Sequence, residues 1–346
     1  MSLDLTATIS ARDLDITLHV ADGETLAILG PNGAGKSSAL GVIAGIVHTD
    51  SGRATLGGER LFDLPDVWRP AHARGTALLA QDPLLFPHLT VLDNVAFGPR
   101  SLGKSRREAR ELARHWLAEV DASELAARKP SQLSGGQAQR IAVARALAAE
   151  PRLLLLDEPM AALDITVVPA MRQMLRRVLT DRSAIIVTHD VLDAVLLADR
   201  VVVMEGGRIV EEGPTKELLA RPRSQFGAGI AGLNLMRGAA SDGAVRTPSG
   251  TVIEGLSDSP VIAGAPAVAV FNPSSVAVYL SRPVGSPRNA FAATILELEP
   301  HGSQVRVRTE ELSADVTVPV VAELELMPGK EIFLVVKASE VAIYPA

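Results

Sequence analysis

Short apolar runs dominate the first sixty residues of the chain, and a glycine-rich segment follows the third of them. The runs LDLTATI, DITLHV, TLAIL and RATLGG have the length and composition typical of strands. A helix is expected over 36–46, directly after the glycine-rich turn. Residues 101–129 carry Leu112, Trp116 and Val120 at helical spacing, and Pro130 ends that stretch. This part of the chain is therefore predicted to combine strands with a helical segment.

From residue 131 to 213 the pattern alternates between helical and strand-like runs. IAVARALAA and MRQMLRRVL have helical composition, whereas LLLLD, SAIIVTH and RVVVM are short and rich in aliphatic residues. Such alternation is typical of a parallel sheet covered by helices. We predict an α/β domain over 1–220, with a helical subdomain at about 88–150.

The composition of the chain changes after residue 220, where Gly, Pro, Ser and short Val-rich runs replace the helical periodicity of the preceding part. We predict a second, strand-rich domain over 221–346. Its sequence looks duplicated, because VFNPSSVAVY at 270–279 matches VVKASEVAIY at 335–344 with an offset of 65 residues. The same offset places Pro222, Arg223 and Phe226 on Pro287, Arg288 and Phe291. Two similar hairpins of biased composition would give part of this match, but one offset at both ends favours two copies of a small β-barrel unit, at about 221–280 and 286–346.

Composition and charge narrow the classes of function. The chain is 47% hydrophobic and 21% charged, which is ordinary for a folded globular protein. A net charge of −6 without a basic tail argues against a general nucleic-acid-binding surface. With no cysteine, disulfides, thiolate metal sites and cysteine nucleophiles are excluded. We expect no signal peptide and no membrane-spanning helix, since no run approaches the roughly 20 apolar residues that a spanning helix needs.

The glycine-rich segment predicts a phosphate-binding loop. Residues 30–37 fit the pattern G-x-x-x-x-G-K-[ST], after a strand-like run and before a helix. Glycines let main-chain N–H groups turn toward phosphate oxygens, and the following helix adds the positive end of its dipole. In this reading a lysine bridges the β- and γ-phosphates and a serine hydroxyl holds Mg²⁺. The residues expected to contact ATP are Gly30, Pro31, Asn32, Gly33, Ala34, Gly35, Lys36, Ser37 and Ser38.

An apolar strand that ends in two acids predicts the hydrolytic half of the same site. Leu153–Leu156 suits a strand covered on both faces, and Asp157 and Glu158 emerge at its carboxyl end, where α/β sheets bind ligands. We expect Asp157 to be a Mg²⁺ group and Glu158 to be the general base for the attacking water.

At this point the chain resembles the ABC ATPases, because Leu133-Ser134-Gly135-Gly136-Gln137 is their LSGGQ signature. The resemblance covers residues 1 to about 220 and implies a P-loop NTPase fold and a homodimer that holds ATP between its subunits. It implies that Ser134, Gly135, Gly136 and Gln137 contact the ATP of the partner subunit, together with Asp164 in AALD. It further implies that Gln81 senses Mg²⁺ and the attacking water, and that His189 in VTHD contacts the γ-phosphate.

The sequence departs from this family in two places. ABC ATPases usually stack an N-terminal aromatic on adenine, but no aromatic residue precedes Phe62 here. Either the planar side chain of Arg12 or that of His19 takes its place, or adenine is held loosely without a stacking partner. In the segment that carries Asp164, Ala161 stands where serine is frequent.

The resemblance also implies partners. Residues 82–91 follow Gln81 and correspond to the border of the groove that receives a helix of the membrane-spanning permease. Four apolar residues in this Pro-punctuated loop, Leu84, Leu85, Phe86 and Leu89, favour an exposed docking patch over a loop that packs on its own subdomain. We therefore expect a peripheral protein at the cytoplasmic face of the membrane, which meets a separate substrate-binding protein only indirectly.

The second domain resembles the TOBE/Mop modules of molybdate-importer ATPases, which carry S-x-R-N and V-K-A-S elements. Here these are 286–289 and 336–339. Arg and Lys supply charge and Ser and Asn supply directed hydrogen bonds, which suits a tetrahedral oxyanion. The resemblance implies that molybdate or tungstate binds there as a feedback signal. Other cargoes (sulfate, iron, polyamine, sugar) and a soluble ABC ATPase without a transporter stay as alternatives. The expected oxyanion contacts are Ser286, Arg288, Asn289, Lys337 and Ser339.

Overall fold

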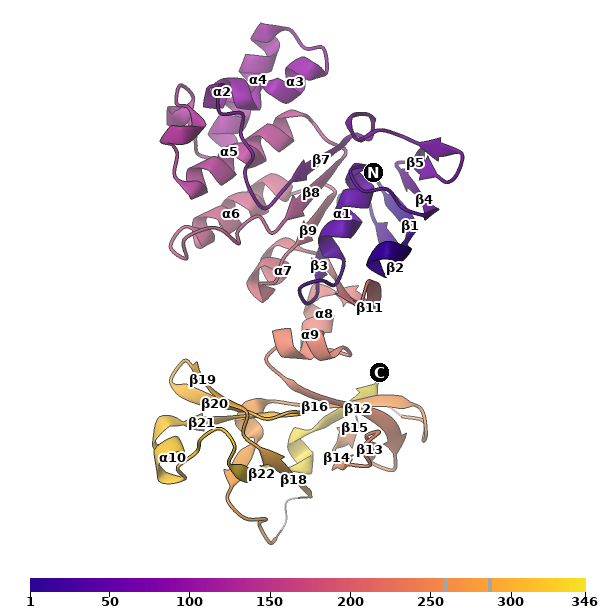
Figure 1. Cartoon of the computed structure of the whole chain (residues 1–346), viewed down its shortest axis with the longest axis vertical. Helices are drawn as coiled ribbons and strands as arrows, with labels where there is room; N and C mark the ends of the chain where they lie inside the picture. The colour runs from indigo at the N-terminus through magenta and orange to yellow at the C-terminus, as the bar shows by residue number, and fades with distance from the viewer. Residues whose placement is uncertain (258–260, 286–287) are drawn as a thin grey trace. The chain divides into compact units, whose positions relative to one another are not determined.

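The computed structural model describes residues 1–257, 261–285 and 288–346. The chain separates into two compact units, Met1–Lys216 and Glu217–Ala346 (Figure 1). The division falls close to the boundary that the sequence suggests at residue 220. Within the described ranges no helix combines the length and the apolarity needed to cross a bilayer.

The central sheet of the first unit has the strand order β11-β10-β3-β9-β8-β7. All neighbours from β10 to β7 are parallel, and β11 pairs antiparallel with β10 at one edge. The strands in the middle of the sheet are buried on both faces, as their uninterrupted apolar sequences predict. The strand bounds are β3 Thr25–Leu29, β7 Thr76–Leu79, β8 Leu153–Asp157, β9 Ala184–Val187, β10 Arg200–Glu205 and β11 Arg208–Pro214.

An antiparallel sheet of order β2-β1-β4-β5-β6 forms a second layer beside helix α1, Lys36–Ala44. Side chains of β1 and β2 alternate between buried and exposed, so one face is apolar. That face shares a core with α1 and with β3, β8 and β9 of the central sheet. The strand bounds are β1 Leu3–Ile9, β2 Leu14–Val20, β4 Ser51–Leu56, β5 Glu59–Asp63 and β6 Val67–Trp68.

A group of helices forms the predicted helical subdomain. Ser105 caps the amino end of helix α4, and its side chain forms a reciprocal capping box with that of Glu108. It ends at Glu119, well before Pro130, and the next residues form short turns. Trp116 and Val120 pack into the core of this part, as the helical spacing predicts. The bounds of these helices are α2 Val91–Val95, α3 Phe97–Ser101, α4 Arg106–Glu119 and α5 Gly135–Ala148. Two further helices lie outside the predicted subdomain and follow β8 and β9 in the chain: α6 Val168–Leu179 and α7 Val191–Leu197.

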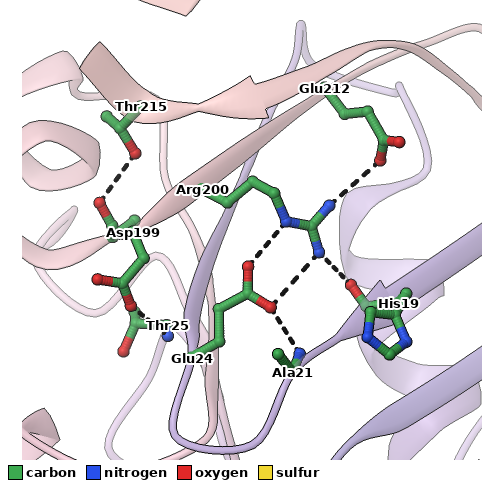
Figure 2. Close-up of polar contacts among 9 residues, drawn as sticks. His19, Ala21, Glu24, Thr25, Asp199, Arg200, Glu212 and Thr215 are labelled. Carbon is green, nitrogen blue, oxygen red and sulfur yellow. Dashed lines mark hydrogen bonds and ion pairs between the residues drawn. The ribbon is translucent and has the colours of Figure 1, made fainter. Parts of the chain in front are cut away.

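Figure 2 shows a polar cluster at the amino ends of β3 and β10, opposite the end where the phosphate loop leaves β3. Arg200 Nε donates to Glu24 Oε1 at 2.7 Å, and Nη1 donates to Glu212 Oε2 at 3.2 Å. The same guanidinium donates to the carbonyl of His19. Arg200 therefore ties β10 to β2, to β11 and to the turn before β3. Burial raises the pKa of Glu24, but the hydrogen bonds from Arg200 and from the Ala21 backbone outweigh it, so this pKa is lowered.

Asp199 extends the cluster to the end of the first unit. Its carboxylate accepts from the Thr25 N–H at 2.9 Å, and its carbonyl accepts from the Thr215 N–H at 3.2 Å. Thr215 begins α8, Thr215–Ala220, the helix in which the second unit starts. The start of β3 and the start of α8 are thus held by the same residue.

The second unit is strand-rich, as expected. Its described strands pair in the orders β14-β13-β12-β16-β23-β15, β17-β22-β18 and β19-β20-β21. Helix α9, Gln225–Ile230, precedes them and α10, Val318–Glu323, follows β21. The strand bounds are β12 Asn234–Ser241, β13 Ala244–Arg246, β14 Val252–Glu254, β15 Leu256–Ser257, β16 Pro266–Phe271, β17 Ala277–Tyr279, β18 Asn289–Thr294, β19 Glu297–His301, β20 Gln304–Arg308, β21 Ser313–Thr317, β22 Glu331–Val336 and β23 Ala342–Pro345.

The segments at 270–279 and 335–344 have the same order of elements. A strand, a 3-10 turn and a second strand occur as β16 and β17 around 273–275, and as β22 and β23 around 338–340. The final strands are exchanged, because β17 pairs with β22 and β23 pairs with β16. Ser275 donates to Glu340 at 3.3 Å, a contact between positions 65 residues apart. The two copies therefore interlock and complete each other's sheets.

The offset of 65 residues does not extend to the start of each copy, and this part of the sequence alignment is wrong. Phe226 lies in helix α9, whereas Phe291 lies in strand β18. The strand pairing shows the real match. Asn234 opposes Phe271 and Asn289 opposes Val336, so the two asparagines are equivalent with an offset of 55. A loop of different length between the paired strands explains why a single offset fails.

Candidate active site

The carboxyl ends of four neighbouring strands bring the predicted nucleotide residues to one edge of the central sheet. The phosphate loop follows β3, His189 follows β9, Asp157 and Glu158 end β8, and Gln81 follows β7. Because the four strands are parallel and adjacent, these groups converge although they are up to 159 positions apart in the sequence, from residue 30 to residue 189.

The phosphate loop has the backbone that its glycines predict. Gly30 has φ 154°, and a Cβ there would lie 2.2 Å from the carbonyl oxygen of Met204. Gly35 has φ 97° immediately before α1, and a Cβ would lie 2.8 Å from the side chain of Leu14. Lys36 is buried, and its Nζ donates to the carbonyls of Gly30 and Pro31 at 2.7 and 2.9 Å. The loop therefore wraps around its own ammonium group.

Burial and neighbouring charges shift the pKa values of Lys36 and Asp157 near the loop. Burial lowers the pKa of Lys36, and the carboxylates of Glu158 and Asp157 oppose this effect. Burial raises the pKa of Asp157, and Glu158 adds to this, while the Ser37 hydrogen bond and Lys36 lower it. One ammonium and two carboxylates thus face one another at the edge of the sheet.

Ser37 and Asp157 fit the requirements of Mg²⁺. Ser37 Oγ donates to Asp157 Oδ1 at 3.2 Å, so a hydroxyl and a carboxylate oxygen already lie side by side. Mg²⁺ prefers oxygen ligands and usually keeps several waters and substrate phosphates, so one carboxylate and one hydroxyl are a sufficient protein contribution. These two residues would hold the ion.

Glu158 and His189 contact each other. His189 Nδ1 lies 3.5 Å from Glu158 Oε2, and the histidine is more exposed than the glutamate, at 63% against 22% of their side chains. Glu158 has φ 46°, and its N–H donates to the carbonyl of Val187 at 2.9 Å. A non-glycine residue with this backbone is uncommon and is held here by a hydrogen bond to the neighbouring strand β9.

A buried ion pair that sequence reasoning missed supports the loop carrying His189. Arg172 of α6 donates to Asp193 Oδ1 through Nε at 2.8 Å and through Nη2 at 2.5 Å, and Nη2 also donates to Asp190 Oδ2 at 2.9 Å. Thr188 Oγ1 donates to Asp193 Oδ2 at 2.8 Å, and the N–H of Asp190 donates to Thr188 Oγ1. The residues on both sides of His189 are therefore fixed. No motif marks Arg172 in the sequence.

Arg12 lies beside the phosphate-loop helix, whereas His19 belongs to another contact. Arg12 Nη1 donates to Ser38 Oγ at 2.9 Å. His19 Nδ1 lies 2.7 Å from Asp4 Oδ1 on the neighbouring strand. Of the two planar side chains considered for adenine, the geometry favours Arg12.

The signature segment forms the exposed start of α5. Ser134 Oγ accepts from the Gln137 N–H at 3.3 Å, and Gln137 Oε1 accepts from the Ser134 N–H at 3.0 Å, a reciprocal capping box. Gly136 packs so closely that a Cβ would lie 2.8 Å from the side chain of Val167. Ser134 and Gly135 are exposed, so the amino end of α5 is accessible to another molecule.

Asp164, also expected to reach the partner subunit, is exposed and locally ordered. Its Oδ1 accepts from the N–H and the hydroxyl of Thr166 at 2.9 and 2.8 Å, and these hydrogen bonds lower its pKa. The adjacent Ile165 is 84% exposed. A large apolar side chain in this position is compatible with a surface that a second subunit covers.

The loop 82–91 is less exposed than the sequence suggests. Leu84 is 67% exposed, but Leu85, Phe86 and Leu89 are half-buried, and Phe86 packs on Phe97 with ring centroids 4.6 Å apart. The expectation of four exposed apolar residues was therefore wrong for three of them. The helical subdomain supplies the apolar contacts that a solvated loop lacks.

Residues of two helices hold this loop: Arg145 on the signature helix α5 and Asn94 on α2. Arg145 of α5 donates to the carbonyls of Pro83 and Leu84 at 2.9 and 2.8 Å. The buried amide of Asn94 accepts from the Phe86 N–H at 2.8 Å and donates back to the Phe86 carbonyl at 3.1 Å. The loop after Gln81 is therefore tied both to the signature helix and to α2.

The residues predicted for an oxyanion differ in their accessibility. Arg288, Lys337 and Ser339 are exposed. Asn289 is 1% exposed, and its amide makes two hydrogen bonds with the backbone of Glu254: Oδ1 accepts from the Glu254 N–H and Nδ2 donates to the Glu254 carbonyl, both at 2.8 Å. Ser286 lies outside the described residues. Asn289 therefore positions the start of β18, and the exposed side chains of Arg288, Lys337 and Ser339 are the ones accessible to an anion.

Comparisons with known proteins agree with this arrangement. The ABC transporter family model matches residues 14–161, and the TOBE domain model matches residues 285–343. The molybdenum import ATP-binding protein ModC of Mycobacterium tuberculosis is 48% identical over 99% of this chain and 97% of its own length. The Fe(3+) ions import ATP-binding protein FbpC 1 of Rhizobium meliloti is 43% identical over 63% of this chain and 61% of its own length.

Solved structures place the first unit in the same class. A dimeric, post-hydrolysis ATP-binding cassette bound to ADP and Pi covers 62% of this chain and 98% of its own, with 29% identity and a TM-score of 0.54. The phosphate loop, the carboxylate pair and the signature helix define an ATP-binding cassette. The chain belongs to the ABC transporter family, as an ATPase subunit with a C-terminal TOBE domain.

Proposed function

We propose that this chain energises the import of molybdate or tungstate, as the ATP-hydrolysing subunit of an ABC importer. The observation that carries the proposal is similarity over the whole length. The ModC relative matches 99% of the chain, including the second unit, whereas the iron-import relative matches 63%. The ATPase unit is shared by importers of many cargoes, so the second unit discriminates among them.

ATP binding follows from the phosphate loop. The ammonium of Lys36, now shared by the carbonyls of Gly30 and Pro31, meets stronger acceptors when phosphate oxygens enter the loop. Main-chain N–H groups and the amino end of α1 add positive potential. Ser37 and Asp157 would hold Mg²⁺, whose charge would help to neutralise the phosphates. Arg12 offers its guanidinium plane to adenine from beside Ser38.

Hydrolysis follows from the carboxylates. Glu158 orients a water toward the γ-phosphorus and accepts its proton as the new O–P bond forms and the bond to ADP breaks. His189, 3.5 Å from Glu158, lies where it can donate to a γ-phosphate oxygen and keep the glutamate in place. Gln81 follows β7, the strand next to β8, and directly precedes the loop 82–91 in the chain. A change in its contacts at the nucleotide site would therefore shift this loop.

A second copy of the chain completes the site. The exposed amino end of α5, with Ser134, Gly135, Gly136 and Gln137, supplies N–H groups, a hydroxyl and a helix dipole to the γ-phosphate of the partner, and Asp164 joins the same interface. The loop 82–91 is the surface for the permease. Docking there places the protein at the cytoplasmic face of the membrane.

The second unit senses the transported oxyanion. Arg288 and Lys337 supply positive charge, and Ser339 supplies a hydroxyl, at a corner that Asn289 holds in shape. Oxyanion binding there would lower ATPase turnover when the cell is replete. The similarity to the iron-import relative FbpC 1 covers only 63% of this chain, so an iron importer is not favoured.

Glu158→Gln tests the ATPase mechanism. The variant keeps the shape of the side chain but cannot accept the proton, so we expect ATP turnover to fall about 10²–10⁴-fold while ATP still binds. Steady-state phosphate release and nucleotide binding would be measured on the same preparation. Glu124→Gln, an exposed glutamate of the same unit, is the matched control and keeps parental turnover. Turnover within threefold of the parent would remove Glu158 from its role.

A further inference from the structure

The second unit contains two equivalent corners, one in each copy of its repeat. Asn289 and Asn234 are buried and start their strands opposite Val336 and Phe271, which are 65 residues apart. Asn289 exchanges two hydrogen bonds with the backbone of Glu254, both at 2.8 Å. Asn234 makes the same two bonds with the backbone of Ser313, also at 2.8 Å.

The two corners have the same backbone hydrogen bonds, but their side chains differ in charge. The Asn289 corner carries Arg288 immediately before the asparagine, Lys337 immediately after Val336, and the side chain of Glu254. In the Asn234 corner the corresponding residues are Leu233, Asn272 and Ser313. The Asn289 corner thus carries two cations and one acid, and uncharged residues occupy all three corresponding positions of the Asn234 corner.

This pattern has an electrostatic reason. Arg288 and Lys337 leave the paired strands β18 and β22 at the same end, because Asn289 opposes Val336. Like charges on facing positions repel each other and destabilise the pairing unless an anion lies between or beside them. Glu254 supplies that anion, with its Oε2 4.0 Å from Arg288 Nε. The three corresponding residues of the Asn234 corner carry no charge, so they need no counter-ion.

We propose that Glu254 is a built-in counter-ion of the oxyanion site, which an arriving oxyanion displaces from Arg288. The inference rests on the proposed oxyanion binding at this corner. The side chains of Arg288 and Glu254 are 70% and 48% exposed, so their attraction is weak and displacement is easy. The carboxylate also repels any anion that stays beside it. Glu254 therefore raises the concentration of oxyanion that is needed to fill the site. Because the corresponding residues of the Asn234 corner carry no positive charge, only the Asn289 corner of each chain binds an oxyanion.

Glu254→Gln tests this competition in the full-length chain. The variant removes the charge and keeps the backbone contacts with Asn289, so we expect molybdate to bind about twofold to fivefold more tightly. Glu323→Gln, an exposed glutamate of α10 in the same unit, changes the net charge equally and is the matched control. Lys337→Ala removes a cation of the site and should weaken binding at least about tenfold. Calorimetry with sodium molybdate measures all four proteins, after circular dichroism has shown equal folding.

The outcomes separate the two proposals. Tighter binding by Glu254→Gln than by the parent and Glu323→Gln, with a stoichiometry of one molybdate per chain, supports the counter-ion. If Glu254→Gln binds like Glu323→Gln while Lys337→Ala binds weakly, the counter-ion is overturned and the oxyanion site stands. If molybdate binds none of the proteins, both proposals are overturned.

Discussion

His189 illustrates how single residues act through their neighbours in this protein. The histidine is exposed, but the residues on either side of it are held by Thr188, Asp193 and Arg172. Asp193 is buried, which raises its pKa, and the guanidinium of Arg172 opposes this effect. Removing one partner of a buried ion pair leaves the other charge buried without its partner. A substitution in this pair is therefore expected to lower the free energy of unfolding strongly.

Asp193→Asn should therefore affect both stability and catalysis. We expect a loss of about 3–5 kcal/mol in the free energy of unfolding, since Arg172 loses its buried carboxylate. Turnover measured well below the melting temperature should fall by up to about 10²-fold, because small misplacements of a reacting group cost rate. The KM for ATP should stay near the parental value, since the phosphate loop is untouched. An unchanged turnover number would show that His189 does not depend on this support.

The sequence predicts the residues of the site better than it predicts their supports. Lys36 belongs to the glycine-rich motif, and Asp157, Glu158 and His189 stand at the ends of recognisable strands, so local pattern predicts their chemistry. Arg172 and Asp193 are 21 positions apart on different helices, and a contact of that kind depends on tertiary packing. Asn289 was expected to bind the oxyanion, but its partner Glu254 lies 35 positions away and belongs to the other copy.

At the scale of elements, Arg200 joins the antiparallel sheet to the central one. It binds Glu24, Glu212 and the carbonyl of His19, and so connects three segments at the end of the sheet away from the phosphate loop (Figure 2). The two carboxylates are not equivalent, because the side chain of Glu24 is 13% exposed and that of Glu212 is 58% exposed. Most of the stabilisation should come from the buried partner.

Glu24→Gln should lower the free energy of unfolding by about 1–3 kcal/mol at neutral pH. Its effect should vanish in acid. The pKa of Glu24 is lowered in the folded state, so the stabilisation is complete above its ordinary value of 4.5 and is lost as the pH falls through the lowered value. Glu212→Gln is the matched control and should cost less than about 1 kcal/mol. Urea unfolding between pH 7 and pH 3 checks this, and a difference that persists unchanged at pH 3 contradicts it.

Element order was easier to predict than element pairing. The alternation of LLLLD, SAIIVTH and RVVVM with helical runs indicates a parallel sheet, but the exchange of β17 and β23 between copies leaves no mark in the sequence. The loop 82–91 was expected to be open, but Arg145 and Asn94, 61 and 8 positions from their partners, tie it down. Such contacts are set by the whole core rather than by local composition.

At the scale of the whole molecule, the proposed ATP site requires two copies of the chain. The phosphate loop and the carboxylates occupy one edge of the central sheet, and the amino end of α5 is exposed on a different subdomain. In the proposed function, the site is completed when the exposed signature of one chain faces the phosphate loop of another. The proposed roles of Glu158, of the loop 82–91 and of the second unit all depend on that closure.

Paired cysteines test this closure most directly, because the natural chain contains none. Asn32→Cys marks the exposed phosphate loop of one preparation, and Gly135→Cys marks the signature of another. A Cβ at Gly135 meets no atom within 4 Å, so this change is tolerated. Both carry Glu158→Gln to prevent turnover. After mixing, a short thiol-to-thiol cross-linker should give the 32–135 heterodimer with MgATP and little without nucleotide. A yield that is equally low in both conditions, while ATP is bound, would contradict the shared site.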